Sequence, residues 1–239
     1  MGKAFEALAA HLREIDHLNS AASLLGWDQQ VLMPHGAAEA RAGQLETLSR
    51  LIHEKFTSEN TLRLLDAAEA EISGADPDSD QVRLISVTRQ DYAEQTRLPS
   101  DLVAETARAT IMAHNVWAEA RQTNDFASFA PTVSHLFDLA RKSADYLGYT
   151  DHPYDALLGL YERGVTSRQV KAIFDEHKPG LVKLIAAIAA HTDAVDDAPL
   201  HQPFDIETQR QFALKVIGSL GFDFNRGRQD ISVHPFAQS

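Results

Sequence analysis

The chain has 239 residues, of which 44% are hydrophobic and 23% charged, the balance of a folded globular protein rather than a disordered one. It contains no cysteine, which excludes a disulfide framework, a thiolate metal site and a cysteine nucleophile. The formal net charge of −12 argues against a nucleic-acid partner, because binding a phosphate backbone needs clustered lysines and arginines.

Apolar residues recur at steps of three and four along nearly the whole chain, the pattern of helices that bury one face. The sequence therefore predicts an all-α fold of about nine or ten helices. In chain order, the expected helices cover residues 5–25, 37–56, 58–72, 82–98, 100–123, 131–147, a short stretch after 153, 166–190 and 212–220.

Several residues indicate where these helices begin and end. Gly26, Gly148 and Gly221 predict the ends of the first, sixth and last helices, because glycine is favoured just after a helix C-terminus. Ser100 predicts an N-cap, and Pro131 is expected in a first helical turn, where proline is tolerated. Thr166 and Gln169 have the spacing of a capping box.

The last third of the chain carries fewer signals. Pro179 is expected to kink or divide its helix, because proline lacks a backbone donor. In the final helix the spacing of Phe212, Val216 and Leu220 predicts an inward face. Residues 231–233 are the one candidate strand.

Nothing in the pattern demands a domain boundary. Residues 73–79 are polar and loop-like, but a loop of this length is typical of a connection between helices, so we expect one domain over 1–239. The N-terminus lacks an uninterrupted apolar run, and residues 181–190 are interrupted by Lys183 and too short to span a bilayer. We therefore expect a cytoplasmic protein with no signal peptide and no membrane partner.

A helical zinc-peptidase site needs two histidines four positions apart with a glutamate beside them as base. None of the 11 histidines has another at that spacing. His53-Glu54 begins like such a motif, but Thr57 stands at the position of the second histidine, which favours a solvated helix end. His35 and Glu39 have helical ligand spacing, yet one pair cannot complete a site. No metal site is expected.

Other catalytic patterns are also missing. The sequence has no G-x-S-x-G elbow, Walker loop or G-x-G-x-x-G motif. Three clusters remain, at residues 27–34, 153–158 and 221–236. In the first two, a structural role in closing a helix pair or capping a helix is at least as well supported as ligand binding. The third is dense in Gly, Arg, Asp and His where the helical pattern ends, which is typical of a functional loop, with a capping segment as the alternative.

Taken together, these clusters resemble the carboxypeptidase Taq family of zinc-dependent carboxypeptidases. The residues that carry the resemblance are Trp27-Asp28, Met33-Pro34, Arg41, Trp117, Ala120-Arg121, Asn124-Asp125-Phe126, Phe129, Pro131, Pro153-Tyr154-Asp155-Ala156-Leu157-Leu158, Tyr161-Glu162, Gly164, Thr166, Gly221-Phe222-Asp223, Gly227-Arg228, Asp230, Ser232 and His234-Pro235-Phe236. The resemblance implies a multi-helix, peptidase-like helical domain. Gly159, Arg163 and Gln229 depart from the family pattern.

The resemblance also implies where catalysis resides. Family members are roughly twice as long, and their H-E-x-x-H helix, third zinc ligand and substrate arginines follow the His-Pro-Phe segment, close to which this sequence stops. We therefore expect a chain that corresponds to the N-terminal half, truncated before the zinc-binding helix. It would have no catalytic residue, no metal ligand and no cofactor of its own, although full-length relatives use zinc. Vestigial substrate-groove candidates are Arg228, His234, Pro235 and Phe236.

Two classes of function remain open. The first is a peptidase-derived chain that is inactive alone, including one half of a split metallocarboxypeptidase. The second is a helical peptide-binding or scaffold module. The resemblance favours a homo-oligomer, since relatives are commonly dimers, or a complementary C-terminal half as partner, with peptides as a further candidate.

Overall fold

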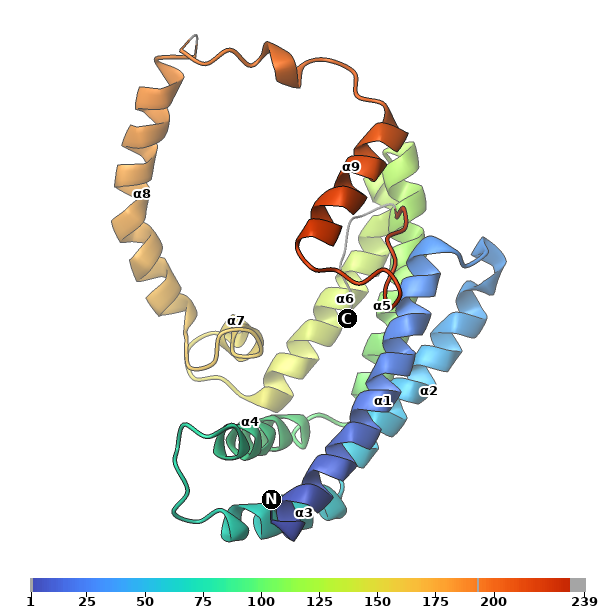
Figure 1. Ribbon diagram of the computed structural model, residues 1–239, viewed down its shortest axis with the longest axis vertical. Helices are drawn as coiled ribbons and strands as arrows, with labels where there is room; N and C mark the ends of the chain where they lie inside the picture. Colours follow the sequence, from blue (N-terminus) through green and yellow to red (C-terminus); the bar gives the residue numbers. More distant parts are fainter. Residues whose placement is uncertain (1, 193, 233–239) are drawn as a thin grey trace. The chain divides into compact units, whose positions relative to one another are not determined.

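The computed structural model describes residues 2–192 and 194–232, and within them all regular structure is helical, which confirms the all-α prediction (Figure 1). The described residues contain nine α-helices and two short 3-10 helices. Their bounds are α1 Lys3–Val31, η1 His35–Ala37, α2 Ala38–Phe56, α3 Glu59–Glu71, α4 Asp80–Gln95, α5 Ser100–Thr123, α6 Phe126–Leu147, α7 Pro153–Leu158, α8 Ser167–Ala189, η2 Ala198–Leu200 and α9 Ile206–Ser219.

The helices form two compact units. The first holds α1 to α7, up to Gly164, together with Ser232, and the second is Val165–Ile231. A compact unit is not the same as an independently folding domain. The expectation of one domain over 1–239 therefore stays a prediction.

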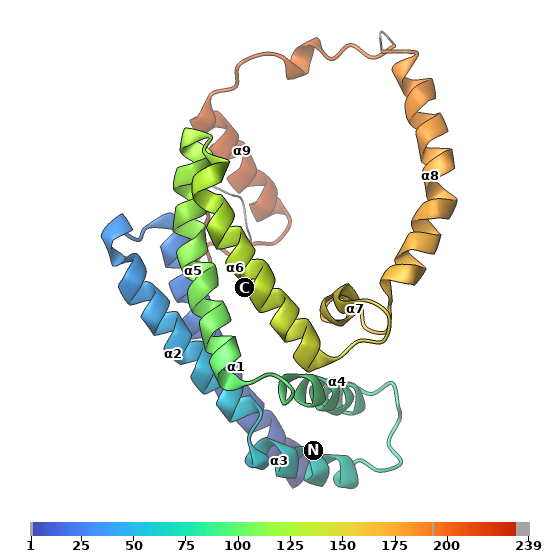
Figure 2. The ribbon, with the colours of Figure 1, turned by 180° about the vertical axis from the view of Figure 1, so that it is seen from behind.

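Within the first unit, α5 is the central helix. It packs against α2 on one side and α6 on the other, as the two opposite views show (Figures 1 and 2). Helix α1 packs against α2 and α3, α4 against α3, and α7 against α6.

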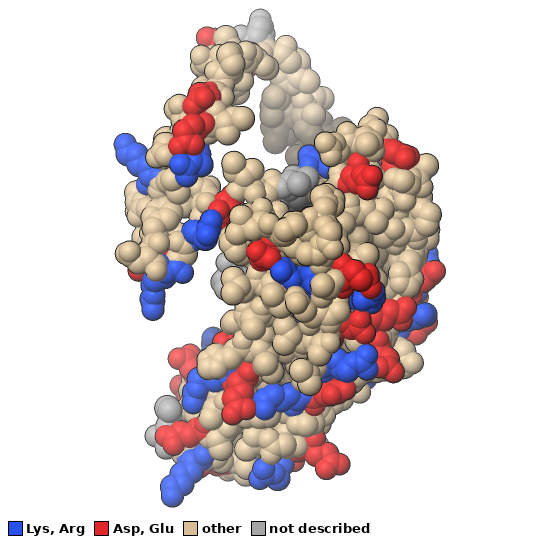
Figure 3. Space-filling view, turned by 90° about the vertical axis from the view of Figure 1, so that its right-hand side faces the viewer, with Lys and Arg blue, Asp and Glu red and all other residues tan. Residues whose placement is uncertain are grey.

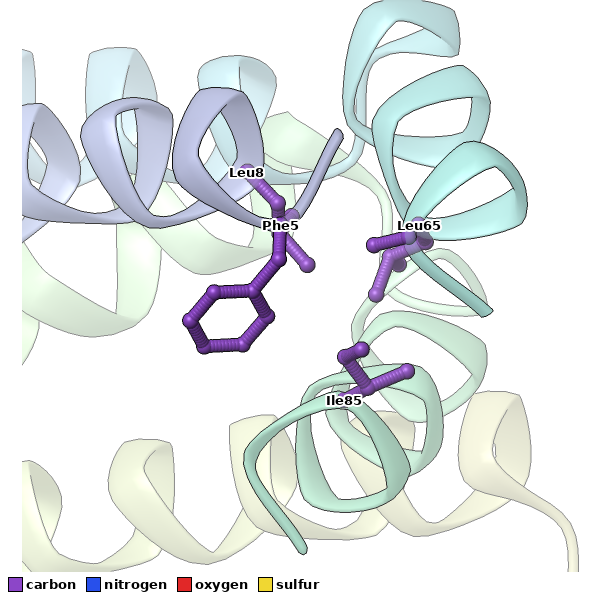
Figure 4. Packing of buried hydrophobic residues seen from close by; sticks show 5 residues of the cluster. Phe5, Leu8, Leu65 and Ile85 are labelled. Atoms are coloured by element: carbon purple, nitrogen blue, oxygen red, sulfur yellow. The ribbon is translucent and has the colours of Figure 1, made fainter. Parts of the chain in front are cut away.

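A cluster of buried apolar side chains joins α1, α3 and α4 (Figure 4). Leu8 and Leu65 are 0% exposed and Ile85 is 2% exposed, so each is removed from water. Phe5 and Ala68 complete the cluster. Burying such side chains is the main favourable term that holds these three helices together.

Local capping chemistry explains several helix starts. Ser58, Ser79 and Asp125 each accept a hydrogen bond from the backbone N–H three residues later. The predicted capping box is present: Gln169 N donates to Thr166 Oγ1 at 3.3 Å, and Thr166 N donates to Gln169 Oε1 at 2.8 Å.

The predicted N-cap at Ser100 is wrong. Pro99 occupies the N-cap position in an extended conformation, with φ of −63° and ψ of 138°, and Ser100 is already helical. Because the proline ring restricts φ to this region, Pro99 provides the change from extended to helical backbone without a side-chain cap.

Two further helix boundaries differ from prediction. Helix α1 continues through Gly26 to Val31, because Gly26 does not adopt the positive φ of a glycine cap and contacts from α2 hold the last turns. Pro131 lies inside α6 rather than in its first turn, since Asp125 caps the helix earlier than expected. The predicted endings at Gly148 and Gly221 are confirmed by φ values of 81° and 93°.

The second unit buries little of its apolar surface among the described residues. Phe212 is 67% and Leu220 is 82% exposed, so the predicted inward face of the last helix is wrong. Periodicity identifies residues that share a face but not whether anything covers that face. Pro179 lies inside α8 without dividing it. Ile231 and Ser232 are not in a strand, and Val233 lies outside the described residues.

None of the helices in the described part of the chain combines the length and the apolar character needed to cross a membrane. Basic and acidic side chains are interspersed over the face of the molecule in Figure 3. Such mixing is the ordinary surface of a globular protein. The absence of a nucleic-acid partner stays a prediction.

Candidate functional site

The residues of the first sequence cluster lie where α1 meets α2. Arg41 on α2 donates one hydrogen bond to Leu25 O and another from Nη2 to Asp28 Oδ2, where the two atoms are 2.6 Å apart. Its side chain is 12% exposed and that of Asp28 is 32% exposed. These contacts hold the turn that follows Gly26 in helical form, which the sequence pattern did not predict.

The same turn of α1 is also tied to α5. Gln29 is buried, and its Nε2 donates to Ile111 O at 3.0 Å. A buried amide is costly unless it is paired, so this bond fixes the separation of α1 and α5. The structural role considered for this cluster is therefore carried by Asp28 and Gln29.

The C-terminal half of α5 adds an aromatic and cationic group. Trp117 lies with its ring centroid 5.6 Å from that of His114, and the Arg121 guanidinium lies 5.6 Å from the same indole. A guanidinium at this distance is attracted by the indole π-system. The arrangement gathers two residues of the resemblance, Trp117 and Arg121, on one helix face.

A cavity of about 890 Å³ adjoins this helix face. It is lined by His35, Ala118, Glu119, Arg121 and Gln122. One turn earlier on α5, His114 Nδ1 and Asn115 Nδ2 are buried without a hydrogen-bond partner. Sequence reasoning missed both residues, although two polar side chains inside an apolar helical pattern were a usable signal.

The ligand-spaced pair His35 and Glu39 is not brought together as a site. Glu39 pairs with Arg108 of α5, and the Arg108 guanidinium also lies 3.6 Å from Glu46 Oε2. The hydrogen bond from Arg108 to Glu39 raises the pKa of Arg108 above its ordinary value. Glu39 therefore connects α2 with α5.

The near-motif at His53 is structural, but it is not the solvated helix end that we expected. His53 is 6% exposed, and its Nε2 lies 2.8 Å from Leu98 O. Because a carbonyl oxygen only accepts, Nε2 carries the proton and donates. Thr57 Oγ1 donates to His53 O at 2.8 Å, while Glu54 is exposed. This histidine joins the end of α2 to the turn before α5.

Among residues 2–192 and 194–232, no group of three or more His, Asp or Glu side chains is arranged to hold a metal ion. The C-terminal half of α5 and the cavity beside it offer the Arg121 guanidinium, the His35 and His114 imidazoles and the Trp117 indole. These groups are suited to binding and orientation.

The second cluster forms α7. His152 Nδ1 accepts a hydrogen bond from Tyr154 N at 3.1 Å, so His152 caps this helix, and the Tyr154 side chain is exposed. After α7, Arg163 pairs with Asp91 of α4 and its Nη1 donates to Gln90 Oε1 at 3.1 Å. Arg163, one of the three residues that depart from the family pattern, thus connects the segment after α7 to α4.

The third cluster is described only in part. Arg228 donates from Nε and Nη2 to the two carboxylate oxygens of Asp230, at 2.6 Å each. A Cβ at Gly227 would come within 2.5 Å of the Phe222 ring, so any larger residue there would require this exposed ring to move. The groove candidates His234, Pro235 and Phe236 lie outside the described residues. A substrate role for these residues and for Arg228 stays a prediction.

Comparison with known proteins adds the wider context. The profile of the Carboxypeptidase Taq (M32) metallopeptidase family matches residues 7–239. Thermostable carboxypeptidase 1 of Thermus thermophilus is 34% identical over 242 residues, covering 98% of this chain and 48% of that protein. Carboxypeptidase 1 of Bacillus subtilis is 31% identical over 226 residues, covering 95% of this chain and 45% of that protein.

Solved structures agree. The crystal structure of BsuCP matches with a TM-score of 0.92 at 29% identity and covers 100% of this chain and 48% of that one. The M32 carboxypeptidase from Deinococcus radiodurans R1 matches with a TM-score of 0.75 at 34% identity, covering 98% of this chain and 46% of that one. The chain spans about half the length of the curated relatives that it matches.

Proposed function

This chain belongs to the carboxypeptidase Taq (M32) metallopeptidase family, and we propose that it forms the helical N-terminal half of a metallocarboxypeptidase-like protein. In this proposal the chain supplies scaffold and peptide-contacting surface. Alone, it does not remove C-terminal residues from peptides. The observation that carries the proposal is the hydrogen bond between His53 Nε2 and Leu98 O. His53 is the one residue that begins a zinc-peptidase motif.

A catalytic zinc site needs three protein ligands and a general base placed beside the metal-bound water. His53 Nε2 is bonded to Leu98 O, and Thr57 stands where the second histidine of the motif would be. The described residues offer no other set of three ligands. They therefore do not fit the metal that the family uses, and we derive no catalytic step through a metal for this chain.

The direct test uses the purified 239-residue polypeptide incubated with zinc. We expect no stoichiometric, tightly bound zinc and no chelator-sensitive release of C-terminal residues from a mixture of peptides. Chelator-sensitive release together with one zinc per chain would show that the chain builds a complete site, and the proposal would be wrong.

A second candidate is one half of a split enzyme, favoured by the coverage of 48% and 45% of two relatives. Co-expression with the unmatched remainder of the Bacillus subtilis relative tests it. A split enzyme would give zinc-dependent activity only in the co-expressed sample. A scaffold or peptide-binding module would give none, yet would still bind peptide in a titration.

The partners in this proposal are a second copy of the chain or a complementary half, and peptides. Support comes from the large apolar side chains that α8 exposes, among them Phe174 at 65% and Ile185 at 57% exposed. Exposed apolar patches commonly form interfaces. Light scattering that shows a monodisperse monomer would exclude the second copy.

A cytoplasmic location is part of the proposal and fits the absence of cysteine, because disulfides are typical of exported proteins.

A further inference from the structure

A second cavity, of about 440 Å³, lies among α1, α2, α4 and α5 of the first unit. Apart from His53, the residues that line it have no role in the function proposed above. Half of the described residues that line it are apolar, namely Ile15, Ala22, Ile52, Phe56 and Val103. The volume lies within the range of about 300–1,000 Å³ that is typical of small-molecule sites.

The side chains of these walls are held in place by their own contacts. Phe56 packs edge-on against Tyr92, with ring centroids 6.3 Å apart and planes at 60°. The Tyr92 hydroxyl donates to Thr57 O at 3.3 Å, and His53 is fixed by its bond to Leu98 O. A ligand would therefore meet a formed cavity and lose little free energy in ordering it.

The polar side chains of the cavity come from three helices: Asn19 from α1, Ser49 and His53 from α2, and Asp91 and Gln95 from α4. Asp91 and Gln95 are one helical turn apart, so both side chains project from the same face. Asp91 is the one residue with a formal charge among the described residues that line the cavity, and no Lys or Arg is among them. A charged ligand in this cavity would be paired with the Asp91 carboxylate only if it is a cation, and an unpaired buried charge is costly. The cavity therefore favours a cation over an anion.

The Asp91 carboxylate is not fully neutralised by its neighbours. Arg163 pairs with Asp91 Oδ1, and its Nη2 lies 3.6 Å from Glu94 Oε2. One guanidinium thus faces two carboxylates, which leaves a net charge of about −1 beside the cavity. The second oxygen of Asp91 and the Gln95 amide oxygen are both acceptors for an N–H donor.

We propose that this cavity binds a small amine whose body is aromatic or branched aliphatic, with the ammonium group at Asp91 and Gln95. The apolar body would be removed from water against Ile52, Phe56 and Val103. The ammonium group would form a charge-assisted hydrogen bond with the carboxylate. This site is separate from peptidase chemistry and does not depend on the function proposed above.

The test is a calorimetric titration of the intact 239-residue chain with 2-phenylethylamine, with 2-phenylethanol as the neutral control of nearly equal size. We expect saturable binding of one amine per chain, and affinity for the alcohol lower by about tenfold or more. Absence of saturable binding, or equal affinity for the two probes, would overturn the proposal.

Three variants locate the bound amine. Asp91→Asn should weaken amine binding about tenfold, and should leave the alcohol unaffected. Arg163→Gln is the matched control, because it breaks the same ion pair and leaves the carboxylate, so amine binding should be kept or become tighter. Ala22→Leu places an isobutyl group in the cavity and should abolish binding while the melting temperature is kept.

Undiminished binding by a folded Ala22→Leu variant would place the amine elsewhere and refute the site. Loss of binding in Arg163→Gln with an unchanged melt would refute the role of the Asp91 carboxylate. None of these readouts involves peptide cleavage. Failure of the amine site would therefore leave the proposed function standing, and the reverse also holds.

Discussion

Replacing Arg41 by alanine tests whether the contact between α1 and α2 stabilises the first unit. The guanidinium bonds to Leu25 O and to Asp28, and the Arg41 side chain is 12% exposed. A hydrogen bond to a charged group contributes about 1.5–3 kcal/mol when it is shielded from water. We discount the Asp28 bond because that carboxylate is 32% exposed, and water replaces part of the lost contact.

With this discount, and with the lost packing of the arginine stem, we expect Arg41→Ala to lower the free energy of unfolding by about 2–3 kcal/mol. The assay is urea unfolding followed by tryptophan fluorescence. The chain has two tryptophans, Trp27 and Trp117, and both lie in the first unit. The fluorescence signal therefore follows the unit in which the substitution acts.

Arg50→Ala is the matched control. Arg50 is also on α2 and its Nη1 lies 2.5 Å from Asp101 Oδ1, but the two side chains are 38% and 89% exposed. An ion pair this exposed contributes about 0–1 kcal/mol. If Arg41→Ala destabilises the protein no more than Arg50→Ala does, the conclusion that the Arg41 contact between α1 and α2 stabilises the first unit is refuted.

Two further predictions concern the core and its pH dependence. Leu65→Ala should lower the free energy of unfolding, measured in a urea titration, by about 2–5 kcal/mol. Leu62→Ala on the same helix, where the side chain is 37% exposed, should lower it by about 1 kcal/mol or less. Burial, followed by the Lys55 ammonium, lowers the pKa of His11, whose Nε2 lies 2.8 Å from Thr61 Oγ1. The unfolded chain therefore binds this proton more readily, and the stability that His11 provides is present above about pH 6.5 and lost as the pH falls below it. Urea midpoints measured between about pH 7 and pH 5 should fall less steeply in His11→Gln than in the unaltered protein, and equal slopes would contradict the assignment.

Helix boundaries that depend on neighbouring residues could be predicted from the sequence. The Thr166–Gln169 capping box and the glycine endings at Gly148 and Gly221 need only residues within one or two turns. The ending at Gly26 was wrong because its outcome depends on Arg41, which lies on another helix. A local pattern cannot contain a bond to a side chain that only the fold brings near.

The same distinction separates what the sequence indicates about the candidate site from what it leaves out. The spacing of His53, Glu54 and Thr57 predicts that no zinc motif forms there, because Thr57 stands at the position of the second histidine. It did not predict that His53 is buried, because its partner Leu98 lies 45 positions away in the chain. Likewise, the resemblance identified Trp117 and Arg121 but not the cavity beside them, which needs His35 from a distant segment.

Membership of a metallopeptidase family and the absence of a fitting ligand set in the described residues are compatible. A fold is fixed by burial and hydrogen bonds spread over many residues, so this chain can match 48% of a longer relative closely, with a TM-score of 0.92. A metal site is fixed by three or four side chains that must converge on one point. Similarity over the matched residues therefore implies the same helices and the same packing contacts between them. Metal-dependent catalysis is implied only where the converging ligands are also present. For this chain, the measurement that separates the two is zinc content, which does not depend on the choice of peptide substrate.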